Sequence, residues 1–178
     1  MPNLSSHPAH PPATVTSVEA RILSVDNVWM TLRWRVEGAR RLVVPPFAGK
    51  VRADGLWQTT CFELFVKPAG GDAYAEFNFS PSQAWAAYDF CGYREGMVER
   101  AIPRPPVCTP RRGQSVLIFD VALPMAGLPV LPFAYGLTAV IEEEGGHKSY
   151  WAMAHREERP DFHHASCFAS RLEAPHQP

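Results

Sequence analysis

The sequence lacks a long apolar run and any surplus of charge of one sign. Its 178 residues carry 17 Lys and Arg against 18 Asp and Glu, a formal net charge of -1. Such a balance, with no block of like charges, argues against a protein that tracks nucleic-acid phosphates or binds membranes through a polybasic patch. No uninterrupted apolar stretch approaches the ~20 residues that a transmembrane helix needs. We therefore expect no nucleic-acid partner and no membrane.

Paired cysteine motifs are also missing. Cys61, Cys91, Cys108 and Cys167 are scattered without a CxxC pair, so the spacing indicates neither a zinc ribbon nor a redox motif. We expect free, mostly buried thiols. The opening MPNLSSHPAHPP has no Lys, no Arg and no apolar stretch of the kind that a secretory signal contains. These residues predict a cytoplasmic location.

Proline is abundant instead. The 18 prolines are roughly twice the average share, and they separate short apolar segments, which leaves little room for long helices. From residue 14 onward the apolar residues recur with period two, which is typical of short strands joined by turns. We predict an all-β fold, a β-sandwich of two mainly antiparallel sheets. The expected strands are 17–25, 29–36, 41–44, 60–67, 73–80, 85–90, 97–102, 115–123, 133–142, 149–155 and 167–172.

The same patterns predict one domain. Residues 1–13 have almost nothing to bury, so we expect a disordered arm. A single β-sandwich domain should then cover residues 14–174, followed by a flexible tail at 175–178. Prolines in the run IPRPP at residues 102–106 cannot donate to a strand ladder, and they mark an edge or loop between two halves of the domain.

Two neighbouring predicted strands carry polar groups among apolar ones. In LWQTTCFELFV, residues 56–66, Glu63 shares a strand face with two apolar side chains. A carboxylate there costs free energy unless it is paired or hydrogen-bonded, so Glu63 either holds a neighbouring strand in register or faces a binding surface. In AYAEFNFSPS, residues 73–82, Glu76 and Asn78 lie opposite phenylalanines. This polar row suits the donors and acceptors of a sugar site, and a solvated outer face is the alternative.

Aromatic and basic residues gather in the same part of the chain. Aromatic rings can stack on the apolar faces of sugar rings, although Trp on a strand is more often part of a core. Our candidate stacking surfaces are Trp57, Trp85, Tyr93 and Trp151, with Arg94 as a further hydrogen-bonding group.

Histidines and carboxylates leave two alternatives open. A metal site would need His155, Asp161 and His163 to converge, but no ligand spacing such as HExxH is present. In the alternative interpretation, His155 and His163 hold loops in place through hydrogen bonds. Glu63 and Glu76 have the residue type of an acid/base pair, as in glycosidases, which would make the protein a hydrolase or lyase together with His155.

Three segments carry a resemblance to a known family. They are LWQTTCFELFV at residues 56–66, AEFNFSPSQAWAAYDFCGYREGM at residues 75–97 and YWAMAHREERPDFHHASCF at residues 150–168. The chain resembles DOMON-like proteins related to family 9 carbohydrate-binding modules. The resemblance implies a β-sandwich that binds a small ligand on one concave sheet, with sugars as the leading class.

The resemblance also implies minor alternatives. Some DOMON relatives bind heme through a Met and a His, for which this chain offers Met97 or Met153 with His155 or His163. Calcium occurs in other relatives, but no Asp-rich loop of a known calcium pattern is present. We expect no resident cofactor.

Together these observations predict a free-standing module that binds a saccharide-like small molecule without chemistry. The alternatives are a heme or metal protein, a hydrolase or lyase, and a protein-interaction module. The expected hydrogen-bonding groups are Glu63, Glu76, Asn78 and Arg94, the expected stacking groups are Trp57, Trp85, Tyr93 and Trp151, and His155 and His163 are expected at the rim.

Overall fold

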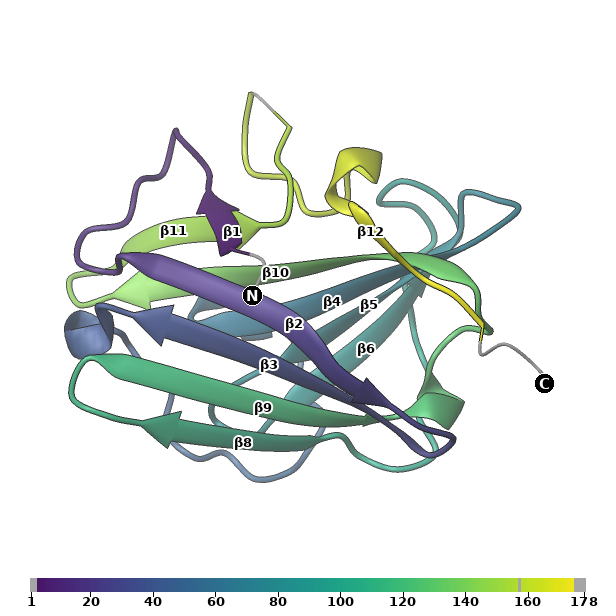
Figure 1. Ribbon diagram of the computed structural model, residues 1–178, viewed down its shortest axis with the longest axis horizontal. Helices are drawn as coiled ribbons and strands as arrows, with labels where there is room; N and C mark the ends of the chain where they lie inside the picture. The colour runs from purple at the N-terminus through teal and green to yellow at the C-terminus, as the bar shows by residue number, and fades with distance from the viewer. Residues whose placement is uncertain (1–2, 157, 175–178) are drawn as a thin grey trace.

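The computed structural model describes residues 3–156 and 158–174 and is almost entirely β (Figure 1). The strands are β1 (Asn3–Ser6), β2 (Ser17–Val25), β3 (Trp29–Glu37), β4 (Cys61–Pro68), β5 (Tyr74–Phe79), β6 (Trp85–Phe90), β7 (Val98–Glu99), β8 (Val107–Arg112), β9 (Val116–Pro124), β10 (Phe133–Glu143), β11 (His147–Ala152) and β12 (Ser170–Leu172). Four short 3₁₀ turns join them, η1 (Ala39–Arg41), η2 (Leu56–Gln58), η3 (Met125–Gly127) and η4 (Ala165–Cys167). Within the described ranges, no helix has the length and apolar character to cross a bilayer.

The strands form one hydrogen-bonded sheet that curls back on itself. Its order is β7-β6-β5-β4-β10-β11-β1-β2-β3-β9-β8, with β12 paired to β10, and neighbouring strands run antiparallel. In Figure 1 the half containing β2, β3, β9 and β8 lies in front of the half containing β10, β4, β5 and β6. The all-β, antiparallel prediction is confirmed. The two expected layers are halves of one sheet, since β1 pairs with β11 on one side and β2 on the other.

The main core lies between these two halves. Trp34 on β3 is fully buried, with its ring centroid 5.6 Å from Phe62 of β4 and 6.3 Å from Phe119 of β9. The Trp34 indole Nε1 donates to the carbonyl oxygen of Thr138, 3.1 Å away, on the opposite half. Aromatic contacts of this kind each contribute about 0.5–1.5 kcal/mol beyond their buried area. The period-two pattern thus brings together aromatic residues that lie far apart along the chain.

Two elements differ from the predicted strands for local reasons. Residues 41–44 do not form a strand, because the chain turns through η1 after Gly38, whose φ is 73°. The backbone of residues 14–16 lies against Gly38, so a side chain there would clash as well as be strained. Strand β8 was not predicted. It contains Pro110 and lies at the edge of the sheet. Proline has no N–H to donate, and an edge strand tolerates it because one side of the strand has no neighbour to bond.

The N-terminal segment also differs from its prediction. We predicted that residues 1–13 would be disordered, yet β1 lies between β2 and β11, and Leu4 and His7 are buried. The segment carries few apolar side chains, but its backbone is hydrogen-bonded on both sides, and no periodic pattern in four residues could show that. The tail predicted at 175–178 lies outside the described residues.

Candidate functional site

The half-sheet β4-β5-β6-β10-β11 is covered on both faces. Leu64 of β4 faces the main core, whereas its neighbours Glu63 and Phe65 point to the opposite face, as strand alternation requires. This opposite face packs against the segment that follows β11 and against η2. The buried residues of this second apolar cluster are Phe65, Tyr74, Ala86, Tyr88, Phe90, Val140, Ala152 and Phe162.

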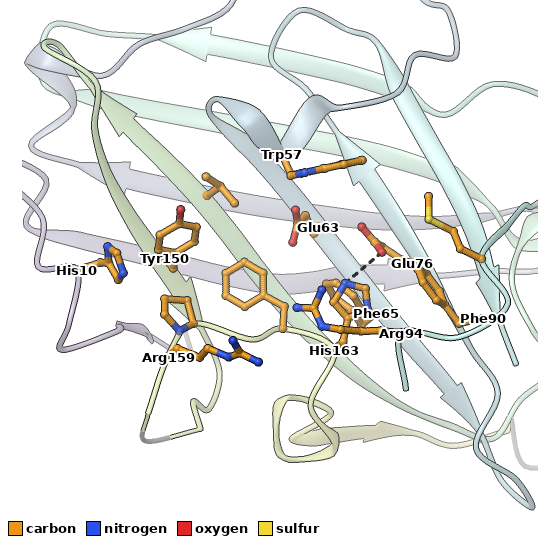
Figure 2. Close-up of a pocket in the computed structure, with 14 residues that line it drawn as sticks. His10, Trp57, Glu63, Phe65, Glu76, Phe90, Arg94, Tyr150, Arg159 and His163 are labelled. Atoms are coloured by element: carbon orange, nitrogen blue, oxygen red, sulfur yellow. Dashed lines mark ion pairs between the residues drawn. The ribbon is translucent and has the colours of Figure 1, made fainter. Parts of the chain in front are cut away.

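A cleft opens within this second cluster. Its volume is about 540 Å³, which is in the range of small-molecule sites. Figure 2 shows Trp57 on one side and Arg94 and His163 on the other, with Glu63 and Glu76 between them in this view. The lining residues are His10, Trp57, Glu63, Phe65, Glu76, Phe90, Arg94, Met97, Val140, Tyr150, Arg159, Pro160, Phe162 and His163.

Two buried carboxyl groups form the polar part of the cleft. Glu63 is 2% exposed and its Oε2 accepts a hydrogen bond from Thr138 Oγ1 at 2.9 Å. Glu76 on the next strand is 6% exposed and its Oε1 accepts from Asn78 Nδ2 at 2.8 Å. Within the part of the chain that the structure describes, no Lys or Arg nitrogen lies within 4 Å of either carboxyl group.

Burial sets the protonation of this pair. Loss of water raises the pKa of Glu63 and of Glu76 above the usual range of a glutamate, and the proximity of Glu76 raises that of Glu63 further. Asn78 Oδ1 is buried without a partner among the described residues, and Asn78 lies directly opposite Glu63 in the β4–β5 register. A protonated Glu63, on the neighbouring strand, has the O–H group that could donate to this oxygen. The two carboxyl groups therefore hold protons at a pH where a solvated glutamate is ionised.

His163 faces Glu76 as a neutral ring. Burial, followed by the nearby positive charge of Arg94, lowers the pKa of His163 to about 4. The Tyr74 hydroxyl lies 2.7 Å from His163 Nδ1 and accepts the Arg94 backbone N–H at 3.1 Å. We therefore assign the hydroxyl proton to the bond with Nδ1, which leaves the ring proton on Nε2, 3.6 Å from Glu76 Oε2. At neutral pH this is a contact between a neutral ring and a carboxyl group, longer than a hydrogen bond.

Asp161 holds the loop of residues 91–96 against the segment that follows β11. Its carboxylate accepts from Arg94 Nη2 at 2.8 Å, from the His163 backbone N–H at 3.2 Å and from the Tyr93 hydroxyl. Burial acts to raise the pKa of Asp161, but the hydrogen bonds from Tyr93 and Arg94 outweigh it, so the pKa lies below its usual range. Arg94 has a positive φ of 56°. Arg94 is thus already paired with a carboxylate before any ligand arrives.

Trp57 provides the exposed aromatic surface of the cleft. It lies in η2, which begins after Gly55, a residue with a φ of 72°. Trp57 is 41% exposed, and its ring centroid lies 6.4 Å from that of Tyr88 in a T-shaped arrangement, while the Tyr88 hydroxyl donates to Asp54. An exposed, supported indole beside buried polar groups is the arrangement expected for stacking against a ligand ring.

The structure brings together part of the predicted site. Trp57, Glu63, Glu76, Arg94 and His163 line the cleft, and Asn78 and Tyr93 bond directly to lining or anchoring groups. The other predicted residues, Trp85, Trp151 and His155, are not part of the cleft lining.

Trp85 and Trp151 require a correction. They are 6% and 4% exposed and belong to the main core, because alternation on β6 and β11 turns them away from the face that carries Tyr88 and Tyr150. His155 lies apart from the cleft lining, where its Nε2 contacts the carbonyl oxygen of Ser5 at 2.6 Å.

Several lining residues were not predicted. Phe65 and Phe90 could have been found from alternation, since each lies two residues from a group on the cleft face. His10, Arg159 and Phe162 come from segments outside regular structure, and no spacing pattern predicts where such segments fold. The structure thus adds one wall of the cleft that the sequence does not indicate.

The described residues contain no group of three or more His, Cys, Asp or Glu side chains placed to hold a metal ion. All four cysteines are free, with Cys91 exposed and the other three buried. The expected free, mostly buried thiols are therefore present.

Comparison with known proteins shows the fold. No family model matches the sequence, and no curated protein matches it. A proposed carbohydrate-binding protein from Bacteroides uniformis matches the structure with a TM-score of 0.62 at 17% identity, over 88% of this chain and 78% of that one. A family 9 carbohydrate-binding module from Caldicellulosiruptor kristjanssonii, in complex with glucose, matches with a TM-score of 0.50 at 8% identity, over 84% of this chain and 74% of that one. The chain therefore shares the fold of carbohydrate-binding modules.

Proposed function

We propose that the cleft binds a small saccharide and does not alter it chemically. The observation that carries this proposal is the position of Trp57, an exposed indole beside the two buried carboxyl groups of Glu63 and Glu76. The apolar face of a sugar ring would stack on the indole, while its hydroxyls exchange hydrogen bonds with the carboxyl groups and with Arg94.

The fold likeness supports this proposal independently. One structure of similar fold is a carbohydrate-binding module in complex with glucose, and another is a proposed carbohydrate-binding protein. We further propose that the chain is a DOMON-like relative of family 9 modules, and that the two halves of its curled sheet correspond to the two layers of their sandwich.

Calorimetric titration with glucose and other hexoses tests the proposal. We expect wild-type protein to bind at least one of them, Trp57→Ala to weaken that binding at least tenfold, and Trp57→Phe to retain part of it. Trp29→Ala is the matched control, because Trp29 lies at the start of β3 and is absent from the cleft lining. The proposal is wrong if Trp57→Ala remains folded by thermal unfolding and binds sugar as wild type does, or if no hexose binds.

A further inference from the structure

The charges around the cleft leave its carboxyl groups without a cation. Arg94 is paired with Asp161 at 2.8 Å, and His163 is neutral at ordinary pH. Arg159 lines the cleft but is exposed, and within the described residues it makes no ion pair with Glu63 or Glu76. Among the residues that the structure describes, no Lys or Arg therefore forms an ion pair with either carboxyl group.

Each of the two carboxyl groups, Glu63 and Glu76, has one oxygen that accepts no hydrogen bond from the described residues. The Thr138 hydroxyl bonds to Oε2 of Glu63, and the Asn78 amide bonds to Oε1 of Glu76. Among the described residues, no hydrogen bond reaches Glu63 Oε1 or Glu76 Oε2. Both side chains are more than nine-tenths buried and line the cleft. Each strand thus presents to the cleft one carboxyl oxygen that is open to a ligand.

A ligand ammonium matches these oxygens in both charge and hydrogen bonding. It has three N–H donors and no acceptor, and charge-assisted bonds to carboxylates are about twice as strong as neutral ones. A ligand carboxylate would instead lie beside two acidic groups, with Arg94 already paired to Asp161 and the exposed Arg159 as the other arginine of the lining.

We propose that the preferred ligand is an amino sugar, whose ring stacks on Trp57 and whose ammonium group lies between the side chains of Glu63 and Glu76. This inference rests on the proposed function and specifies its ligand class. On binding, the ammonium favours the ionised carboxylates, so protons leave the pair and pass to the buffer.

Competitive calorimetry with five related sugars tests the ligand class. We expect glucosamine to bind at least about tenfold more tightly than glucose, a difference of about 1.4 kcal/mol, and N-acetylglucosamine to lose that advantage. Glucuronate should bind more weakly than glucose. The dimer of glucosamine, obtained by removing both acetyl groups from the dimer of N-acetylglucosamine, distinguishes a free monosaccharide from the end of a polymer, since a cleft for the monosaccharide alone should reject it.

Proton release gives a second readout. Titrations of glucosamine in buffers of different ionisation enthalpy should show protons released to the buffer, and titrations of glucose should show far fewer. Glu76→Gln should weaken the binding of glucosamine at least about tenfold more than the binding of glucose, because an amide keeps a hydrogen-bonding group in place but cannot ionise to pair with the ammonium. Glu158→Gln, an exposed carboxylate of the neighbouring loop that is absent from the cleft lining, is the matched control and should change neither ligand.

The outcomes separate this inference from the proposed function. Equal or tighter binding of glucose, with no excess proton release for glucosamine, would overturn the amino-sugar inference and leave saccharide binding standing. Absence of binding by every sugar would overturn both. Selective binding of glucosamine that survives Glu76→Gln would also overturn the inference, because the ammonium would then lie elsewhere.

Discussion

Buried glutamates occur in two regions of this molecule, and the two regions differ in how many hydrogen bonds each carboxyl group accepts. Glu143 at the end of β10 accepts backbone N–H bonds from Ala13 and Thr14 at 2.7 Å each and from Val15 at 3.2 Å, as well as a bond from the Thr14 hydroxyl. Burial acts to raise the pKa of Glu143, yet these bonds outweigh it and the pKa lies below its usual range.

The cleft pair has the opposite balance. Glu63 and Glu76 receive one hydrogen bond each, so burial dominates and raises their pKa values. A buried carboxylate that the chain satisfies fully holds the chain together, whereas one that the chain leaves partly unsatisfied is available to a ligand. Glu143 therefore fastens residues 13–15 to the end of β10, and the cleft pair supports a binding role.

The largest expected effect is on the free energy of unfolding, and it should differ strongly between Glu143→Gln and Glu76→Gln. Glu143→Gln removes the charge that three backbone N–H groups share and turns an amide group toward donors, so we expect a loss of about 3 kcal/mol of unfolding free energy. Glu76→Gln should cost less than about 1 kcal/mol near neutral pH, because it replaces a protonated acid by a group of similar shape. Urea denaturation of both variants measures the difference, and equal losses would contradict the comparison.

The pH dependence of stability should separate the two regions in sign. Above the ordinary glutamate pKa of 4.5 the unfolded chain releases protons that the cleft pair retains until its raised pKa values are reached, so this pair makes stability fall as pH rises. Glu143 behaves oppositely, since its contribution is present above the ordinary pKa and is lost as pH falls through the lowered one.

His163 opposes the cleft pair below its ordinary pKa of 6.5, because there the unfolded chain binds a proton that the buried ring refuses until about pH 4. The clean window therefore begins near pH 6.5. Above pH 6.5, the free energy of unfolding of the Glu63→Gln/Glu76→Gln double variant should rise relative to that of wild type, by up to about 1.4 kcal/mol per pH unit for each proton that the wild-type pair retains. Parallel stability curves for the two proteins, measured by denaturation at several pH values, would show that the carboxyl groups are already ionised in the folded protein.

The smallest expected effect concerns the support of His163. Tyr74→Phe removes the hydroxyl that bonds both His163 Nδ1 and the Arg94 backbone N–H, so we expect a loss of about 1 kcal/mol of unfolding free energy and weaker sugar binding. Tyr135→Phe is a control of the same chemistry, because no hydrogen bond of the Tyr135 hydroxyl occurs among the described residues. If both variants lose the same stability and bind sugar equally, the Tyr74 hydroxyl does not organise the cleft.

Alternation along β4 and β5 was enough to predict which residues share a face. On β5, Glu76 and Asn78 were assigned to one face and the phenylalanines to the other, and on β4 Glu63 was assigned to a face with two apolar side chains, as the structure has them. Alternation alone does not show which face of a strand meets a cleft. Trp85 and Trp151 were therefore placed in the site although they lie in the core.

Contacts between distant segments were beyond prediction from one chain. The bond between Arg94 and Asp161 joins residues 67 positions apart, and the bonds from residues 13–15 to Glu143 span about 130 positions. Such pairs leave no periodic signal, since their geometry depends on how the loops pack after the sheet has formed. This is why β1 and one wall of the cleft appear only in the structure.

Carbon-13 NMR of the glutamate carboxyl groups, in protein labelled at that position and titrated with glucose and glucosamine, tests the central claim most directly. We predict that Glu63 and Glu76 titrate above the ordinary glutamate pKa without sugar, that both signals shift when sugar binds, and that Glu143 titrates below the ordinary value and does not respond. The account is contradicted if the three groups titrate alike, or if saturating sugar leaves the signals of Glu63 and Glu76 unchanged.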